Sequence, residues 1–257
     1  MSGRPLILVS NDDGFASRGI RALAAELARE ADVVICAPAS NQSASSHSLT
    51  LHHVLRLAEQ APRVFSIDGT PADCVYVALH TESRVLERTP DLCVSGVNHG
   101  VNLGVDVFYS GTVAAAREAA LRGIPAVALS AGKGADLLAA ARMGTQIALA
   151  ALKETRDDPS APRLYNVNFP PGDAWEARAT TLGKRTYDGE VVFRKDPRGA
   201  DYLWIGGSGA VHHASPGSDT DAYDAGQVGV TPLTLSLSEP TGLPASERIA
   251  RRTMERP

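Results

Sequence analysis

The chain has 257 residues, 44% of them hydrophobic and 21% charged, so it is long enough to bury a sizeable core in one large or two modest domains. Its formal net charge of −4, with no local stripe of Lys and Arg, argues against a partner such as a nucleic-acid duplex. Because no apolar run is long enough for a signal-peptide core or a membrane span, we expect a cytoplasmic protein without a membrane partner.

The first 155 residues alternate between short apolar runs and amphipathic segments. Residues 6–9 are a continuous apolar run, typical of a strand buried on both faces, and apolar positions from Ile20 to Leu27 follow helical spacing. This alternation predicts an α/β fold, a doubly wound, mostly parallel sheet with helices on both faces. Further strands are predicted at 33–36, 91–94 and 125–129, and helices at 71–87, 112–121 and 135–153.

Two stretches interrupt the alternation. Residues 49–57 keep apolar side chains at odd positions, which is the period of a half-exposed strand, so we expect an antiparallel excursion there. Residues 156–162 combine Asp, Pro and Ser, a composition that favours a loop or linker.

The chain changes character after this linker. Residues 163–169 and 231–237 look like strands, whereas 206–229 is rich in Gly, Ser, Asp and His and has no helical period. We therefore divide the chain into an α/β catalytic core, 1–155, and a C-terminal part, 156–257. The second part is expected to complete the core and to supply a smaller β-rich arm for oligomerisation.

Three cysteines, Cys36, Cys74 and Cys93, lie far apart in the sequence, each among apolar neighbours. None forms a Cys-x-x-Cys pair, so a structural zinc site or a disulfide framework is not expected. They are predicted to be buried free thiols, as is usual in a reducing compartment.

Polar clusters follow the predicted strands or open the predicted helices at five places. In a doubly wound sheet the parallel strands end at one edge, where the following helices also begin. The side chains at these places are therefore predicted to line one pocket. The clusters are 11–14, 40–46, 69–73, 95–100 and 110–112.

Asp12 and Asp13 are adjacent carboxylates that repel each other, and both can face one point only if the backbone turns, as Gly14 permits. A hard divalent cation would relieve the repulsion, and oxygen ligands suit magnesium or manganese better than zinc. An ordinary turn with a helix cap also explains these residues, because Asn, Asp and Gly are turn formers.

The segment from Ser110 to Thr112 precedes an alanine-rich helical run, so its N–H groups and hydroxyls would face an anion such as phosphate. A simple helix cap is the commoner use of such residues. Residues 96–104 contain Gly-Val-Asn-x-Gly twice, which lets the backbone approach a ligand while Asn98 and Asn102 offer donors and acceptors. An Asx-turn loop explains this pattern equally well.

Taken together, six segments resemble the survival protein E (SurE) family of metal-dependent nucleotidases. Their order and spacing agree with the family over most of the chain, and later pieces at 196–199, 204–206 and 219–232 also look like its C-terminal half. In the second loop this chain has Ala39, Ser40 and Ala44 where the family commonly has Asp, Arg and Gly. The six segments are 8–14, 37–38 with 41–43, 48–51, 69–75, 95–98 and 109–116.

The resemblance implies a 5′-nucleotidase that hydrolyses nucleoside monophosphates, with 3′-nucleotides and short polyphosphate as further substrates. It also implies a homodimer or homotetramer with exchanged C-terminal elements. One divalent cation per subunit, Mg²⁺ or Mn²⁺, would bind to Asp12, Asp13, Ser43 and Asn98. Either aspartate would be the catalytic base toward an attacking water. The residues expected to bind phosphate or substrate are Asn11, Ser43, Asn98, Asn102, Ser110, Gly111 and Thr112.

Two other classes compete with this interpretation. A phosphoacceptor receiver domain also has acidic residues after its first strand, and Lys133 follows an apolar strand as such a domain requires, but the strand that ends near Ser95 and Asn98 carries no acceptor aspartate. A phosphatase of the haloacid dehalogenase type requires an Asp-x-Asp spacing, which is missing here.

Overall fold

The computed structural model of the protein describes residues 3–206 and 209–254. Its centre is a nine-stranded sheet with the strand order β3-β4-β2-β1-β5-β6-β7-β13-β8. The six neighbouring strands β4, β2, β1, β5, β6 and β7 pair in parallel. β3 pairs with β4, and β13 with β7, in the antiparallel sense. This confirms the predicted α/β class. The strands are β1 (Leu6–Ser10), β2 (Asp32–Pro38), β3 (Leu57–Ala61), β4 (Val64–Ile67), β5 (Leu92–His99), β6 (Ala126–Ala131), β7 (Leu164–Phe169), β8 (Ala177–Ala179) and β13 (Val228–Pro232).

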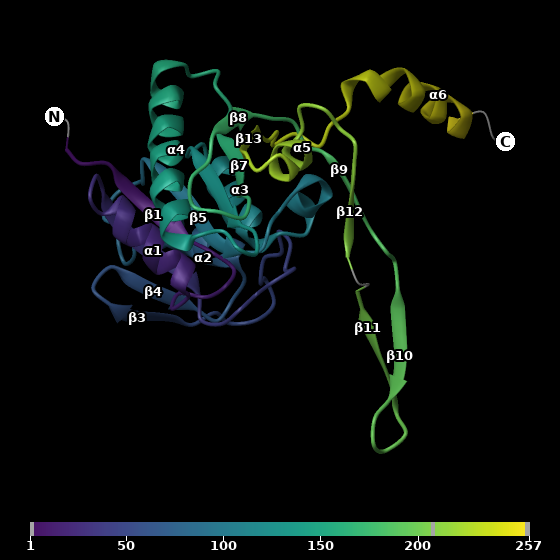
Figure 1. The fold of residues 1–257 in the computed structure, drawn as a ribbon, viewed down its shortest axis with the longest axis horizontal. Helices are drawn as coiled ribbons and strands as arrows, with labels where there is room; N and C mark the ends of the chain where they lie inside the picture. Colours follow the sequence, from purple (N-terminus) through teal and green to yellow (C-terminus); the bar gives the residue numbers. More distant parts are fainter. Residues whose placement is uncertain (1–2, 207–208, 255–257) are drawn as a thin grey trace.

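Helices cover both faces of the sheet, and β1 shows how the core is divided between them. Leu6 and Leu8 belong to the cluster that packs against α2 and α3, whereas Ile7 and Val9 belong to the cluster on the side of α1 and α4. All four side chains are fully buried, as the continuous apolar run predicts. Figure 1 shows this layering. The helices are α1 (Arg18–Leu27), α2 (Pro71–His80), α3 (Gly111–Leu121) and α4 (Leu137–Asp157).

The prediction of a strand at 49–57 is wrong. Residues 49–56 form no strand, and β3 begins only at Leu57. Thr50 instead bonds to Asp73 at the start of α2, its N–H to Oδ1 at 2.8 Å and its hydroxyl to Oδ2 at 2.6 Å. Leu51 and Val54 remain largely exposed, because an alternating pattern makes a strand only where a partner strand lies alongside it.

Two predicted boundaries also need correction. The helix expected at 71–87 ends at His80, because Glu82 and Ser83 have positive φ values of 44° and 72°. The linker expected at 156–162 begins two residues later, because α4 continues to Asp157.

The C-terminal part is more regular than its composition predicts. β7 confirms the strand expected at 163–169, but β13 ends at Pro232, so the strand expected at 231–237 is wrong in most of its length. The stretch 206–229 contains β12 (Ala210–His213) and α5 (Asp219–Asp224). Residues 207–208 of that stretch lie outside the described residues.

A long arm projects from the sheet (Figure 1). Two antiparallel pairs build it, β9 with β12 nearer the sheet and β10 with β11 farther out. Its outer part exposes large apolar side chains, among them Phe193, Trp204 and Ile205. The last helix, α6, lies away from the sheet in the same view. These elements are β9 (Lys184–Tyr187), β10 (Val191–Lys195), β11 (Asp201–Ile205), η2 (Pro240–Gly242) and α6 (Leu243–Met254).

Cys36, Cys74 and Cys93 are buried and free, as predicted. Across the described part of the chain, no helix combines the length and the apolar character needed to cross a membrane.

Asp91, the residue before β5, forms hydrogen bonds with both β1 and α4. Its carboxylate accepts hydrogen bonds from the Leu6 N–H at 2.9 Å, from Arg88 at 2.8 Å and from Arg156 at 2.7 Å. Burial raises the pKa of Asp91, but these three donors more than offset that effect, so the pKa lies below its ordinary value of 3.8.

Asp91→Asn is therefore expected to lower the free energy of unfolding at pH 7 by about 1.5 kcal/mol, the scale of a hydrogen bond to a charged group. Because the pKa is lower in the folded state, Asp91 stabilises the protein above about pH 4 and loses this effect as the pH falls through the folded-state value. Urea unfolding at several pH values measures the difference, which should shrink toward pH 3. Asp173→Asn, at an exposed carboxylate, is the control and should cost little at any pH.

Candidate metal and phosphate site

Segments far apart in the sequence meet where β1 ends. Asp12 follows β1, and its backbone oxygen accepts a hydrogen bond at 2.8 Å from the Gln42 N–H, in the loop after β2. The Asp12 carboxylate accepts a hydrogen bond from the Thr112 hydroxyl, in the first turn of α3. These two contacts alone bring three of the five polar clusters together at the carboxyl edge of the parallel strands.

The N-terminus of α3 packs closely against Asp12. A methyl group at Gly111 would lie 2.8 Å from Asp12 Cβ and 2.9 Å from Ser45 Oγ, distances at which something must move. Ser110 Oγ accepts the Val113 N–H at 3.1 Å and so caps the helix. Because a hydroxyl that accepts one bond still has its own proton, Ser110 remains able to donate to a ligand.

Asp13 contacts the end of β5. Its Oδ2 accepts the His99 N–H at 3.1 Å, and His99 directly follows Asn98 in the chain. The amide nitrogen of Asn98 donates to the Gly100 carbonyl at 2.9 Å. The oxygen of the Asn98 amide is therefore the atom suited to act as a ligand.

The electrostatics around Asp12 favour a bound cation. Its carboxyl group is almost completely buried. Burial and the charge of Asp13 outweigh the hydrogen bond from Thr112 and raise the pKa of Asp12 to about 6. Two neighbouring carboxylates, one of them buried, are unfavourable as free anions, and a divalent cation would compensate both charges.

Three other predicted site residues donate hydrogen bonds from their side chains to other groups of the protein. Asn11 is fully buried and donates to the Gly14 carbonyl at 3.0 Å and to Ser17 Oγ at 2.9 Å, so it holds the turn after β1. Asn102 donates to Ser130 Oγ at 2.8 Å beneath its own loop. Ser43 is exposed, and its hydroxyl donates to Asn41 Oδ1 at 2.7 Å.

Ser45 was not singled out from the sequence. Its hydroxyl oxygen is buried beside Gly111 and has no hydrogen-bond partner within the described residues. A buried hydroxyl is normally paired, so Ser45 Oγ is one of the few buried polar atoms that the described residues leave without a partner. The serine-rich composition of 40–46 was the available signal, but it did not distinguish one serine from another.

The donor set fits a hard cation. Within residues 3–206 and 209–254, no group of three or more His, Cys, Asp and Glu side chains is arranged to hold a metal ion. The candidate ligands here are instead two carboxylates, a hydroxyl and an amide oxygen. Oxygen ligands of this kind suit magnesium and manganese, whereas zinc prefers nitrogen and sulfur.

The loop after β2 contains a non-glycine residue in the left-handed region, Ala44 with φ 58°. An L side chain there costs roughly 1–2 kcal/mol, and glycine removes this cost but loses part of the gain to its greater freedom in the unfolded chain. Ala44→Gly is therefore expected to raise the free energy of unfolding by about 0.5 kcal/mol, measured by urea unfolding. Ala58→Gly, on the exposed edge strand β3, is the control and should lower it. A lower stability for Ala44→Gly would contradict the expectation.

Residues 7–189 match the model of the family described as Survival protein SurE. A protein of Sorangium cellulosum named 5′-nucleotidase SurE is 64% identical over 235 residues, which are 91% of this chain and 91% of the relative. A protein of the same name from Myxococcus xanthus is 45% identical over 95% of this chain and 93% of its own length. The crystal structure of the Sure protein from Aquifex aeolicus superposes with a TM-score of 0.80 at 34% identity, covering 96% of this chain and 100% of that one.

Proposed function

The chain belongs to the SurE family, and from this premise we propose how it acts as a 5′-nucleotidase, hydrolysing nucleoside monophosphates to nucleoside and phosphate. A divalent cation, Mg²⁺ or Mn²⁺, would be held by Asp12, Asp13, Ser43 and Asn98. The observation that carries the proposal is the packing of the α3 N-terminus against the buried carboxylate of Asp12.

The first turn of α3 binds the phosphate in this proposal. The backbone N–H groups of Gly111 and Thr112 lie at a helix N-terminus, where the partial positive charge of the helix favours an anion. The hydroxyl of Ser110 donates to a phosphate oxygen while it still accepts the Val113 N–H. These donors stabilise the charge that develops on the phosphoryl oxygens as the ester bond breaks.

The cation, when bound, supplies Lewis-acid stabilisation of the phosphoryl group. Thr112 keeps the Asp12 carboxylate in one orientation through its hydroxyl, and the His99 N–H does the same for Asp13. One of the two aspartates then accepts the proton of the attacking water.

In this proposal Asn11 and Asn102 belong to the substrate site because they hold two of its loops in place. Asn11 holds the turn that presents Asp12, and Asn102 anchors the loop that precedes Ser110. The two alternative classes, a receiver domain and a phosphatase of the haloacid dehalogenase type, are not favoured. The relatives that match most of this chain are named 5′-nucleotidases.

We also propose that residues 156–257 complete the catalytic core of residues 1–155 and provide the surface for a homodimer or homotetramer. The support is the arm, whose exposed Phe193 and Trp204 are large apolar side chains of the kind that interfaces bury. A cytoplasmic location is proposed from the three buried free thiols. Light scattering of the purified protein measures the oligomeric state.

Phosphate release tests the proposed function. The screen uses nucleoside 5′- and 3′-monophosphates and a short polyphosphate, each with magnesium, with manganese and with EDTA. We expect the fastest release from 5′-monophosphates, slower release from the other two classes, and loss of release in EDTA. Release that continues unchanged in EDTA, or no release from any nucleotide, would contradict the proposal.

A further inference from the structure

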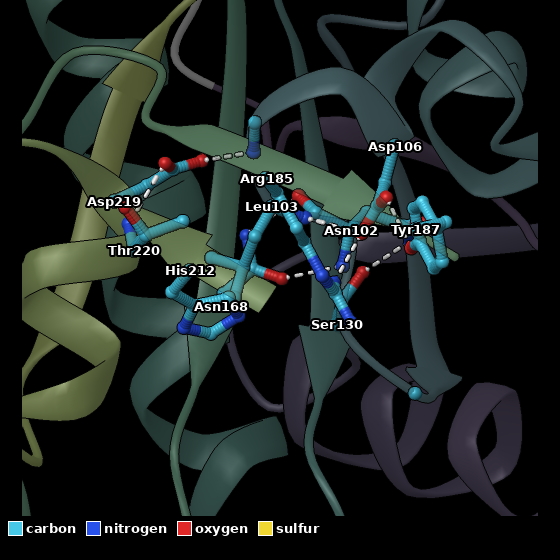
Figure 2. A network of polar contacts seen from close by, with 12 residues as sticks. Asn102, Leu103, Asp106, Ser130, Asn168, Arg185, Tyr187, His212, Asp219 and Thr220 are labelled. Atoms are coloured by element: carbon cyan, nitrogen blue, oxygen red, sulfur yellow. Dashed lines mark hydrogen bonds and ion pairs between the residues drawn. The ribbon is translucent and has the colours of Figure 1, made fainter. Parts of the chain in front are cut away.

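The loop between β5 and α3, residues 100–109, joins two parts of the proposed site. Asn98 lies just before this loop and Ser110 just after it. The loop includes the short helix η1 (Gly104–Phe108). It is held by the sheet at one point and by the base of the arm at another (Figure 2).

The sheet holds the loop at Asn102. The backbone N–H of Asn102 donates to Asn168 Oδ1 at 2.8 Å. Its carbonyl accepts from Asn166 Nδ2 at 2.8 Å and from Asn168 Nδ2 at 3.0 Å. Since these partners lie on β7 and are buried, one point of the loop is fixed to the core.

The arm holds the loop at Asp106. This carboxylate accepts the Leu103 N–H at 3.1 Å within the loop, and it also accepts hydrogen bonds from the Arg185 guanidinium and the Tyr187 hydroxyl. Arg185 and Tyr187 both lie on β9, at the base of the arm (Figure 2). The side chains of Asp106 and Arg185 are 8% and 14% exposed, so the ion pair is shielded from water and salt.

A second carboxylate joins the same two parts. Asp219, at the start of α5, accepts the Gly104 N–H of the loop at 3.0 Å and the Gly183 N–H just before β9 at 2.6 Å. Burial and the neighbouring Asp106 raise the pKa of Tyr187 to about 12, so its hydroxyl remains a proton donor at neutral pH. The base of the arm and the loop therefore form one hydrogen-bonded unit.

We propose that Arg185 and Tyr187 are positioning residues of the nucleotidase site. Through Asp106 they fix the loop, and the loop in turn places Asn98 at one end and the first turn of α3 at the other. Neither residue needs to touch the substrate for this role. The inference rests on the proposed function, because it concerns how that same site is held.

The test compares substitutions at three neighbouring positions of β9. Tyr187→Phe removes one hydroxyl from Asp106, and Arg185→Met removes the guanidinium. Thr186→Val is the matched control, because Thr186 lies between them and bonds instead to His213 Nε2 at 2.8 Å. The measurements are kcat and KM for AMP, the Kd for Mn²⁺ from the paramagnetic resonance signal of the free ion, and the oligomeric state by light scattering.

We expect Arg185→Met to lower kcat/KM at least tenfold and to raise the Kd for Mn²⁺ at least threefold, and Tyr187→Phe to change both by about threefold, since small displacements of binding groups have large effects on rate. Arg185→Lys, which keeps the charge, should recover part of the loss. Thr186→Val should stay within twofold of the wild-type protein in both quantities.

Wild-type kcat/KM and Mn²⁺ affinity in both Arg185→Met and Tyr187→Phe would overturn the inference, even if the melting temperature falls. An equal loss in Thr186→Val that accompanies dissociation of an oligomer would overturn it as well. If the wild-type protein neither binds Mn²⁺ nor releases phosphate, the proposed function itself fails, which is a different result.

Discussion

Asp12→Asn is expected to lower kcat/KM for nucleoside monophosphates by about a thousandfold, or roughly 4 kcal/mol, the upper end of the range for removing one group that stabilises developing charge. The substitution keeps the shape of the side chain and its ability to accept the Thr112 hydroxyl. It removes one of the two negative charges on which the proposed cation depends. Steady-state phosphate release at saturating Mn²⁺ and at a series of lower concentrations measures the change.

The control is Asp157→Asn, which removes an equal charge at the exposed end of α4. Its kcat/KM should stay within twofold of wild type. Asp12→Asn should also leave the protein at least as stable, because burial raises the pKa of Asp12 from 3.8 to about 6, so the aspartate lowers the free energy of unfolding increasingly from about pH 4 and fully above about pH 6. Near-wild-type, manganese-dependent hydrolysis by Asp12→Asn would contradict the assignment of this residue.

Gly111→Ala is expected to lower kcat/KM about a hundredfold with a much smaller effect on folding. The added methyl would lie 2.8 Å from Asp12 Cβ, 2.9 Å from Ser45 Oγ and 3.0 Å from Pro71 Cγ, so Asp12 or the helix end must shift. Alanine has a higher helix propensity than glycine, by up to about 1 kcal/mol. In the free energy of unfolding this gain offsets part of the strain that the methyl group causes. A displacement of about 1 Å in the site is sufficient for a loss of this size.

Gly189→Ala is the matched control, because no atom lies within 4 Å of the added methyl at this position in the arm. Thermal unfolding and steady-state kinetics of both variants separate an effect on the site from an effect on the fold. If Gly111→Ala keeps wild-type kcat/KM, the first turn of α3 is not in contact with the phosphate.

Some elements of the fold could be predicted from sequence because their pattern depends on the element alone, whereas others depend on what packs beside them. The buried run at 6–9 is continuous because both faces of β1 are covered, which is a property of the strand itself. The alternating run at 49–57 also predicts a strand, but residues 49–56 form none, since an alternating segment becomes a strand only where another strand lies beside it. The ends of helices could not be predicted from apolar spacing either. The spacing continues past His80, but α2 ends there and Glu82 has a positive φ.

The candidate site shows the same contrast. Asp12, Gly111 and Thr112 could be grouped in advance, because strand ends and helix starts converge at one edge of a parallel sheet. The engagement of Asn11 in its own turn and the unpaired hydroxyl of Ser45 could not be foreseen. Both depend on which atoms lie within about 3 Å of each other, and turn-forming composition is compatible with either arrangement.

The parallel α/β core and the oxygen-rich chemistry of the clusters at its strand ends could be predicted from the amino-acid sequence, because periodicity and residue type are local properties. Which groups stay available for a ligand, and which support the others, depends on how the distant segments pack against one another. The link from Arg185 on the arm to Asp106 spans 79 residues of sequence. A contact of that kind leaves no local pattern, since it arises only when packing brings the two charges together out of water.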